Sequence, residues 1–315
     1  MDPDLDEVEL PRGLALAWGV AAHPQQRGPK RELSLERIVD AAVEIADAEG
    51  LGAVSMSAVA KQLGFTTMSL YRYVTSKDDL LLLMGEQALG APPLSITEAT
   101  GWREGLVRWH DETMTVYTAH PWLLDLPIAG IPSTPANLAW MDAALELMSG
   151  TPLEPLESTA VLLLMTGHAR WQAIVDHGYT NRAREVGITP NELDRQIAGM
   201  IERLVTAEQF PYLRGAIDAG VFTADDDPLA FGLERILDGV ELYVRSRAEG
   251  APAAMPTEPE DPPATDAFPK DTKVRAARIA RREAEKAARE AQKKVREAVK
   301  REREAVARAR EREKK

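Results

Sequence analysis

A seven-residue segment at 67–73, TMSLYRY, combines hydroxyl groups, aromatic rings and one cation within about two helical turns. In a helical register Leu70 and Val74 point inward, and Met68 and Arg72 point most directly outward. The flanks between these faces are occupied by Thr67, Ser69, Tyr71 and Tyr73. The major groove of DNA admits one helix, whose exposed side chains read base edges while hydroxyls and cations hold phosphates. The segment therefore predicts a DNA-reading helix.

Two short helices joined by a tight turn, Met56–Thr75, must position this segment. Ala60 is small enough for the two helices to approach each other, and Gly64 tolerates the positive φ that the turn needs. Their shared core is predicted to consist of Val59, Leu63, Leu70 and Val74. This is the form of a helix-turn-helix. The alternative is a structural helical hairpin that binds nothing.

Capping residues mark the ends of the helices in this region. A first helix is expected to end at Gly50, and its apolar face comprises Leu35, Ile38, Val39, Ala42, Ile45 and Ala46. Ser55 is a suitable N-cap for the helix 56–63, and Thr66 for the reading helix. Ser76, with Asp79 at capping-box spacing, opens a fourth helix. The apolar face of that helix comprises Leu80, Leu83, Met84 and Ala88.

The string RIVDAAVEIADAEGLGAVSMSAVAKQLGFTTMSLYRYVTSKDDLLLLMGEQAL closely resembles the DNA-binding domain of the TetR family of bacterial transcriptional regulators. The resemblance covers about residues 32–91 and includes the VAKQLG core, the SLYRYV recognition helix and the SKDDL opening of the fourth helix. Within residues 1–31, the LAWG…RGPKR extension is similar to that of many actinobacterial members. A TetR-like chain is all-α, with a three-helix DNA-binding domain joined to a larger helical domain. That second domain forms a homodimer and encloses a small-molecule pocket.

The resemblance also implies which residues contact DNA. Base contacts are implied for Thr67, Met68 and Ser69, and phosphate contacts for Tyr71, Tyr73 and Lys77. Ser57 is a further candidate, but many members have Arg at this position, so a guanine contact is not expected from it. Arg72 is either an alternative cation for DNA or a solvated surface residue.

A basic cluster on the N-terminal arm, Arg27, Lys30 and Arg31, also leaves two interpretations open. It either reaches a phosphate or the minor groove, or it is a solvated linker. Residues 27–90 hold seven Lys/Arg and nine Asp/Glu, so we expect only modest non-specific affinity for DNA.

Residues 92–249 are predicted to form the larger helical domain. Helices are expected at about 101–119, 135–149, 154–177, 189–206, 208–219 and 228–248. The helices 154–177 and 228–248 are apolar over faces so broad that each needs partners on more than one side. By resemblance, they pair with their copies in a four-helix dimer interface, and Val240 is expected to lie on that surface.

Aromatic and polarisable side chains concentrate in this domain, and six of them are candidates for a ligand pocket: Trp109, Tyr117, Trp140, Met165, His168 and Trp171. Ligand sites are mostly apolar with a few polar groups, so a largely apolar effector is expected. The alternative for each residue is simple core packing. Pairs such as His110–Asp111 are adjacent in sequence and point apart on a helix. The sequence therefore predicts no metal site and no cofactor, and it has no HExxH, P-loop or GxSxG motif.

The net charge of −12 over 315 residues is unevenly divided. Residues 270–315 carry 19 Lys/Arg and 9 Asp/Glu, whereas residues 1–269 carry 19 Lys/Arg and 41 Asp/Glu. Six prolines within 250–269 predict an extended linker between these acidic and basic parts. The tail 270–315 is rich in helix formers with Glu-before-cation pairs at i,i+4, which favours an isolated solvated helix or a disordered segment over a coiled coil.

The chain contains no cysteine, and this excludes disulfides, Cys-ligated metals and thiol catalysis. Its acidic N-terminus lacks the pattern of a signal peptide, and no apolar run is long enough to span a bilayer, so we expect a cytoplasmic protein.

The function that these observations favour is a repressor released from its operator by a small molecule. A nucleic-acid-associated scaffold that binds through its basic tail is the alternative. An enzyme is a third alternative, which no motif supports.

Overall fold

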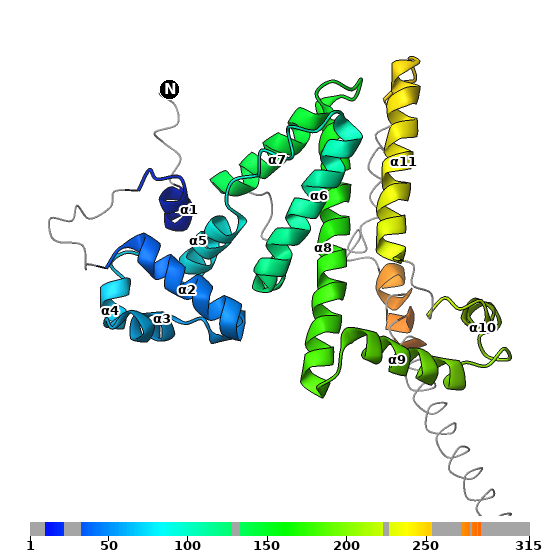
Figure 1. Ribbon diagram of the computed structural model, residues 1–315, viewed down its shortest axis with the longest axis horizontal. Coiled ribbons are helices and arrows are strands. Elements are labelled where there is room, and N and C mark those ends of the chain that lie inside the picture. The colour runs from blue at the N-terminus through cyan, green and yellow to red at the C-terminus, as the bar shows by residue number, and fades with distance from the viewer. Residues whose placement is uncertain are drawn as a thin grey trace, which may run out of the picture. The chain divides into compact units, whose positions relative to one another are not determined.

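The computed structural model describes residues 10–21, 33–127, 133–222, 227–253, 272–277, 279–281 and 283–284, and the chain divides into two units, 1–253 and 254–315 (Figure 1). The elements of the first unit are α1 (Arg12–Ala17), α2 (Leu35–Glu49), η2 (Leu51–Ala53), α3 (Met56–Leu63), α4 (Thr67–Leu70), α5 (Lys77–Leu89), α6 (Trp102–Ala119), η3 (Pro121–Asp125), α7 (Pro135–Met148), α8 (Pro155–Val186), α9 (Pro190–Leu204), α10 (Pro211–Asp218) and α11 (Pro228–Ala248). The described residues of the second unit are also helical. No strand occurs among the residues described, and the predicted all-α class is confirmed.

Two predicted helix boundaries in the larger domain were wrong. The helix expected to end at residue 177 continues to Val186, where Gly187 adopts the left-handed conformation at φ +72. The helix expected from residue 208 begins only at Pro211, whose fixed φ and missing N–H suit the first helical position. The basic arm 22–32, for which DNA contact and a solvated linker were both left open, lies outside the described residues. The same holds for the tail beyond residue 284, for which an isolated helix and a disordered segment were left open.

The helices α1–α5 form a first cluster, called the head below. The central helix of the head, α2, begins after Ser34, whose hydroxyl accepts a hydrogen bond from the N–H of Arg37, and ends before Gly50 at φ +82. It packs against α3 and α5. Its buried face consists of Ile38, Val39, Ala41, Ala42, Val43, Ile45 and Ala46. This face is the one that the 3.6-residue periodicity predicts.

The helix α1 of the N-terminal extension belongs to the core of the head. It packs against α5, and Leu16 is buried in the same hydrophobic cluster as α2. Gly13 allows this approach, because a Cβ atom there would lie 2.7 Å from a carboxylate oxygen of Asp79. The indole N–H of Trp18 also donates to the backbone oxygen of Ser133 at 2.9 Å, just before α7. The extension thus contacts both α5 and the segment just before α7.

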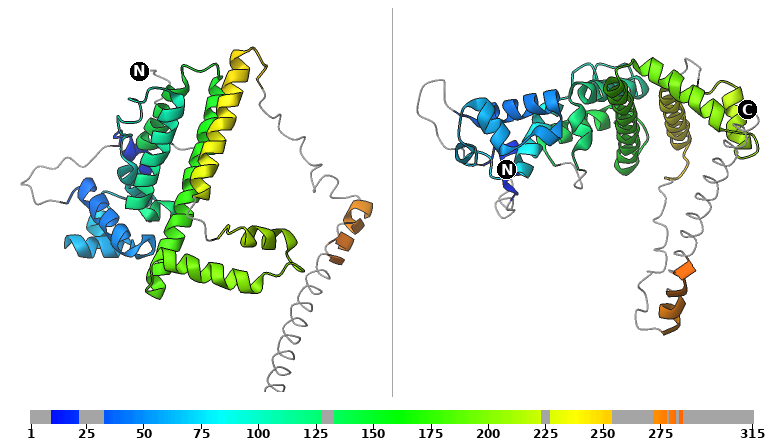
Figure 2. Two further views of the ribbon diagram at one scale, coloured as in Figure 1. Left: turned by 45° about the vertical axis from the view of Figure 1, so that its right-hand side comes forward. Right: turned by 90° about the horizontal axis from the view of Figure 1, so that it is seen from below.

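The helices α6–α11 form the rest of the first unit, called the body below, and α8 and α11 run side by side in it (Figure 2). Its hydrophobic core is supplied by α6, α7, α8 and α11, together with Ile96. Arg103, near the start of α6, holds α11 through carboxylates of Glu234 at 2.6 Å, Asp238 at 2.8 Å and Glu241 at 3.0 Å.

A buried carboxylate, Glu157, joins the start of α8 to the end of α11. It accepts hydrogen bonds from the N–H of Glu154 at 2.7 Å and from the hydroxyl of Tyr243, and it lies 3.3 Å from Nε of Arg247. The Tyr243 hydrogen bond, followed by the Glu154 N–H, lowers the pKa of Glu157 below its ordinary value of 4.5. The charged form is therefore favoured in the folded protein.

Replacing Glu157 with glutamine is expected to lower the stability at neutral pH and to flatten its acid dependence. A lowered folded-state pKa contributes stability above pH 4.5, and this contribution is lost as the pH falls through the folded-state value. Urea unfolding at several pH values, followed by circular dichroism, measures both effects. Glu146→Gln, the same change at an exposed site on α7, is the control. Equal acid dependence in both variants would show that Glu157 does not contribute in this way.

Candidate nucleic-acid interface and effector cavity

The helix-turn-helix is built from α3, α4 and the turn between them. The hydroxyl of Ser55 accepts a hydrogen bond from the N–H of Ala58 and caps α3. Ala60 is buried against α4, and Gly64 has φ +76 and ψ 28, which is the left-handed region. The N–H of Phe65 then returns to the carbonyl of Ala60 at 2.9 Å. This closes the helix and turns the chain toward α4.

The reading helix is shorter than its predicted length of 67–73. The α-helical part ends at Leu70, and the next three residues form a turn. Thr66 does not cap the helix with its side chain as expected, because its hydroxyl pairs with that of Ser69 at 2.9 Å. Leu70 and Val74 are both fully buried in the core of the head. They fix which side of this segment faces the solvent.

The predicted DNA-contacting residues differ in how far the structure exposes them. Met68 is 74% exposed and Tyr71 is 42% exposed. Ser57, Arg72 and Lys77 are also exposed, whereas Thr67, Ser69 and Tyr73 are half-buried. The hydroxyl of Ser57 lies 3.0 Å from that of Ser55, beside the cap of α3.

Lys77 is the first residue of α5. Ser76 caps this helix by accepting from the N–H of Asp79 at 3.0 Å, as predicted. The carboxylate of Asp79 accepts instead from the hydroxyl of Thr75 at 2.6 Å. Of the two reciprocal hydrogen bonds of a capping box, the structure therefore shows only the one from the N–H of Asp79 to Ser76. Lys77 is exposed, and in the sequence it follows the turn 71–73 closely.

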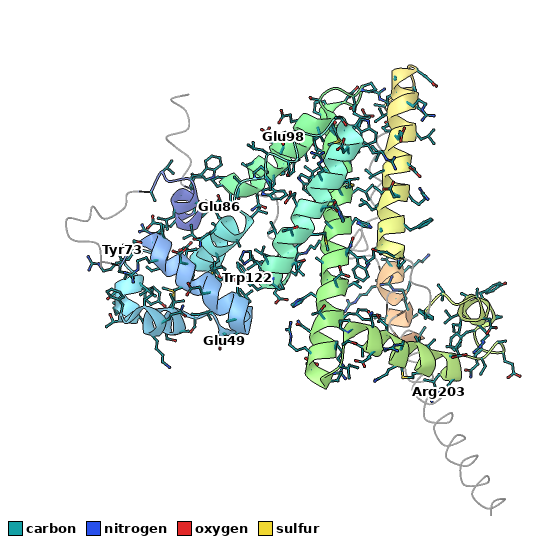
Figure 3. All side chains as sticks on the ribbon, in the orientation of Figure 1. Glu49, Tyr73, Glu86, Glu98, Trp122 and Arg203 are labelled. Atoms are coloured by element: carbon teal, nitrogen blue, oxygen red, sulfur yellow. The ribbon has the colours of Figure 1, made fainter. Side chains whose placement is uncertain are left out.

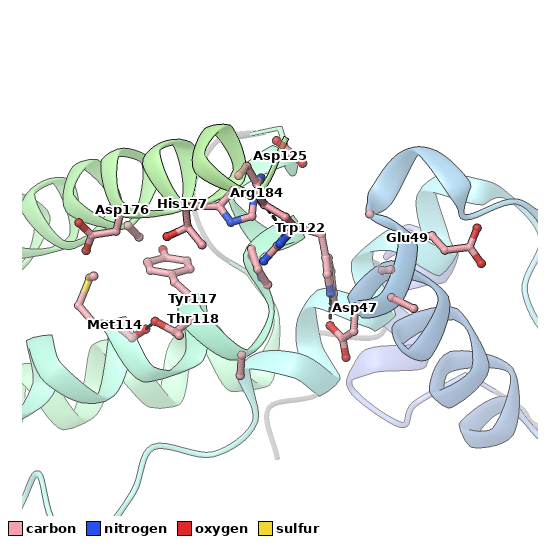
Figure 4. Close-up of a pocket in the computed structure, with 18 residues that line it drawn as sticks. Asp47, Glu49, Met114, Tyr117, Thr118, Trp122, Asp125, Asp176, His177 and Arg184 are labelled. Carbon is pink, nitrogen blue, oxygen red and sulfur yellow. Dashed lines mark hydrogen bonds between the residues drawn. The ribbon is translucent and has the colours of Figure 1, made fainter. Parts of the chain in front are cut away.

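A cavity of about 650 Å³ lies between the end of α2, the end of α6, η3 and α8 (Figure 4). From α2 and its C-terminus it is lined by Ala46, Asp47, Ala48, Glu49 and Gly50; from α6 and η3 by Met114, Tyr117, Thr118, Ala119, Pro121, Trp122 and Asp125; and from α8 by Ala173, Asp176, His177, Thr180, Asn181 and Arg184. The head thus contributes one wall, and the body contributes the others. Its size is within the usual range of ligand pockets.

Of the six side chains predicted to line a pocket, only Tyr117 lines this cavity. Trp109, Trp140 and Met165 are buried in the hydrophobic core of the body. The two indoles are satisfied there by backbone oxygens, since Trp109 donates to that of Trp140 at 3.0 Å and Trp140 donates to that of Gly90 at 3.1 Å. For these residues the structure shows the alternative, core packing.

The two other candidates occupy different environments. Nε2 of His168 lies 3.1 Å from the backbone oxygen of Leu229 and must donate to it, and Nδ1 of the same ring lies 3.2 Å from Nε2 of His110. Burial lowers the pKa of His110, which favours the neutral form of that imidazole. Trp171 is 59% exposed and points away from the core.

The cavity adjoins a junction that sequence analysis did not identify as a site. Asp47 at the end of α2 accepts hydrogen bonds from Nδ1 of His120 at 2.8 Å and from the indole N–H of Trp122 at 2.6 Å. Trp122 is buried and lies between the head and α6 (Figure 3). A second tie is made by Glu86 on α5, whose carboxylate accepts from the N–H of Ala136 at 2.9 Å. The only sign of this junction in the sequence was Trp122, an aromatic residue just after the helix predicted to end at residue 119.

Large apolar side chains are exposed along α8 and α11. On α8 they are Leu156, Leu163, Leu164, Trp171, Ile174, Tyr179 and Val186, and on α11 they are Phe231 and Leu242. Val240, which we expected on this surface, is buried in the core of the body. A Val240→Asp change would therefore disrupt the protomer itself rather than an interface. The positions 156, 163, 164, 171 and 174 form one stripe, because steps of three, seven and eight residues return to nearly the same side of a helix.

Within the described ranges, no helix is long and apolar enough to cross a membrane. The same part of the chain contains no group of three His, Cys, Asp or Glu side chains arranged to hold a metal ion.

Two family models match the chain. Residues 38–84 match the model described as bacterial regulatory proteins, tetR family, and residues 95–244 match the tetracyclin repressor-like C-terminal domain. The HTH-type transcriptional repressor DrrR1 of Streptomyces coeruleorubidus is 37% identical over 251 residues, which cover 78% of this chain and 90% of the relative. An HTH-type transcriptional repressor of Mycobacterium tuberculosis is 28% identical over 258 residues, with 78% and 96% covered.

Solved structures agree with these matches. Apo ActR from Streptomyces coelicolor has a TM-score of 0.57 and 25% identity, over 70% of this chain and 98% of ActR. ActR in complex with actinorhodin has a TM-score of 0.56 and 26% identity, over 67% and 96% of the two chains. Together with the helix-turn-helix geometry of α3 and α4, these similarities show that the chain belongs to the tetR family of bacterial regulatory proteins and is a DNA-binding transcriptional regulator.

Proposed function

We propose that this regulator is a homodimeric repressor that binds operator DNA through α3 and α4 and releases it when a small molecule occupies the cavity. The observation that carries the proposal is the composition of the cavity wall, which combines residues of the head with residues of the body. A molecule held there acts directly on the position of the head. Release requires that the molecule bind the DNA-free arrangement more tightly than the DNA-bound one.

The relatives support repression that is relieved by a small molecule. The curated relatives named above are transcriptional repressors, and the ActR structure shows that one neighbour of this fold binds a small molecule, actinorhodin. An effector with a largely apolar body suits the side chains of Met114, Tyr117 and Trp122 in the cavity. The scaffold alternative is not supported, because the family matches lie within residues 38–244 and account for DNA binding without the tail.

The exposed stripe on α8 supports the homodimer. It consists of large apolar side chains that no other described part of the protomer covers. A two-fold interface places the same patch of both copies face to face, so one apolar stripe is enough to form it. Dimerisation would present two heads to two half-sites of an operator.

The DNA contacts are tested by separating contacts to phosphates from contacts to bases. Lys77→Ala should weaken binding to cognate and scrambled duplexes alike and lower the salt slope by about 1, because a phosphate contact carries no sequence information. Substitution of Thr67 or Met68 by Ala should instead reduce the preference for the cognate duplex by about 1–3 kcal/mol where either makes a strong base contact.

The measurement is a salt titration of binding by each variant to both duplexes, with the cognate duplex obtained by in vitro selection. Lys61→Ala, an exposed cation near the end of α3 and outside the proposed contact set, is the control for net charge. The proposed docking would be wrong if Lys77→Ala changed sequence preference while Thr67→Ala and Met68→Ala left it unaltered.

A further inference from the structure

We infer that the molecule recognised by the cavity is a lipophilic cation, held by the carboxylates of Asp47, Asp125 and Asp176 against the aromatic face of Tyr117. This inference rests on the proposed function, because it assigns a chemical class to the effector of the same cavity. It is carried by the balance of charges around the cavity, by the hydrogen bonds that neutralise one wall residue and by the apolar surface of the α6 wall.

Carboxylates predominate among the charged groups of the cavity wall. Asp47, Asp125 and Asp176 line it from three different elements, α2, η3 and α8. Glu49 also borders the cavity, but its side chain points away from it (Figure 4). Among the described residues that line the cavity, Arg184 is the only Lys or Arg. The cavity therefore carries an excess of negative charge, which attracts cations and repels anions.

Hydrogen bonds show that His177 does not offset this excess in the arrangement observed. Arg184 donates to the amide oxygen of Asn181 at 3.0 Å, and this fixes the orientation of the amide. Its NH₂ group then faces Nε2 of His177 at 2.7 Å and must donate to it. A nitrogen that accepts a hydrogen bond carries no proton, so this imidazole is neutral. Part of the hydrogen-bonding capacity of Arg184 is also used by Asn181.

The carboxylates of Asp176 and Asp125 are less compensated than that of Asp47. No hydrogen bond or ion pair to either of them occurs among the described contacts, whereas Asp47 accepts from both His120 and Trp122. Partial desolvation raises the pKa of Asp176, and the charge of Asp227 raises it further. Both effects disfavour the negative charge, and a bound cation would counter them. Asp176, although exposed to solvent, is therefore a position where a bound positive charge would stabilise the complex.

The opposite wall suits the apolar part of such a ligand. Met114, Tyr117 and Thr118 of α6 face Asp176 and His177 of α8 (Figure 4). A cation near an aromatic face gains about 0.5–2 kcal/mol from the ring quadrupole. Methionine adapts its shape to flat or bulky apolar groups. Charge and surface together select a cation with aromatic or aliphatic bulk in preference to a small inorganic ion.

The test uses two probes of nearly equal size and shape but opposite charge, tetraphenylphosphonium and tetraphenylborate. Binding of each to the full-length protein is measured by equilibrium dialysis at neutral pH. We expect tetraphenylphosphonium to bind at least about 10-fold more tightly than tetraphenylborate. Asp176→Asn should weaken binding of the cation about 5-fold, and Arg184→Gln should strengthen it about 2-fold, in line with partly exposed charge contacts.

Glu185→Gln is the matched control, because it removes the same charge from an exposed position of α8 outside the cavity. Binding of the cation should be unchanged in this variant to within about 2-fold. Preferential binding of tetraphenylborate, or equal losses in Asp176→Asn and Glu185→Gln, would overturn the inference. Operator binding by the unliganded protein is measured in parallel. If operator binding is retained while the charge preference is absent, the effector class is wrong but the regulator proposal stands.

Discussion

Replacing Leu163 with aspartate is expected to separate the dimer into monomers and to abolish tight binding to the operator. Leu163 is 63% exposed in the protomer and lies in the apolar stripe of α8. In a two-fold interface the substitution appears twice, so two carboxylates would be placed against apolar surface and against each other. Burying an unpaired charge costs several kcal/mol. We expect a loss of at least about 4 kcal/mol, or about a thousand-fold in the dimer dissociation constant.

Sedimentation equilibrium at micromolar concentration measures the first effect, and operator binding measures the second. Leu204→Asp is the matched control, because Leu204 on α9 is similarly exposed but lies outside the stripe. This variant should remain dimeric. Circular dichroism should show the same helix content for both variants, since neither residue is part of the protomer core. The interface would have to lie elsewhere if Leu163→Asp remained a dimer with unchanged affinity.

Replacing Trp122 with alanine is expected to cause the largest loss of protomer stability, about 3–5 kcal/mol. Trp122 is 2% exposed, belongs to the hydrophobic core of the head and donates its indole N–H to Asp47. Truncation leaves a cavity between α2 and η3 and removes a hydrogen bond to a carboxylate. Because the side chain joins head and body, operator affinity should fall as well.

Trp122→Phe separates the two contributions. It retains a ring in the core but loses the hydrogen bond to Asp47, so we expect a loss of about 1–3 kcal/mol. Tyr212→Ala, which truncates an aromatic side chain that is 94% exposed on α10, should change stability by less than about 0.5 kcal/mol. Urea unfolding followed by far-ultraviolet circular dichroism gives all three values. A loss for Trp122→Ala no greater than that for Tyr212→Ala would contradict the role of this residue.

Local patterns in the sequence determined most of the helices and the form of the helix-turn-helix. Caps such as Ser55 and Ser76 act on N–H groups only three residues away, and Gly64 supplies a backbone conformation that other residues rarely adopt. These effects depend on neighbours in the sequence, so they could be predicted without a tertiary structure. The family resemblance added which residues of this motif are candidates for contacts with DNA.

The arrangement of side chains in the body was decided only by the tertiary structure. On a stretch such as 160–165 of α8, which is apolar nearly all round, periodicity does not indicate which face is covered. Met165 is buried in the core, whereas Trp171 is exposed, although both looked like pocket residues. Val240 was misplaced for the same reason. The cavity itself depends on Asp47 meeting residues more than seventy positions away, such as His120. Contacts of this kind follow from how the helices pack, and the helical period of each segment does not encode them.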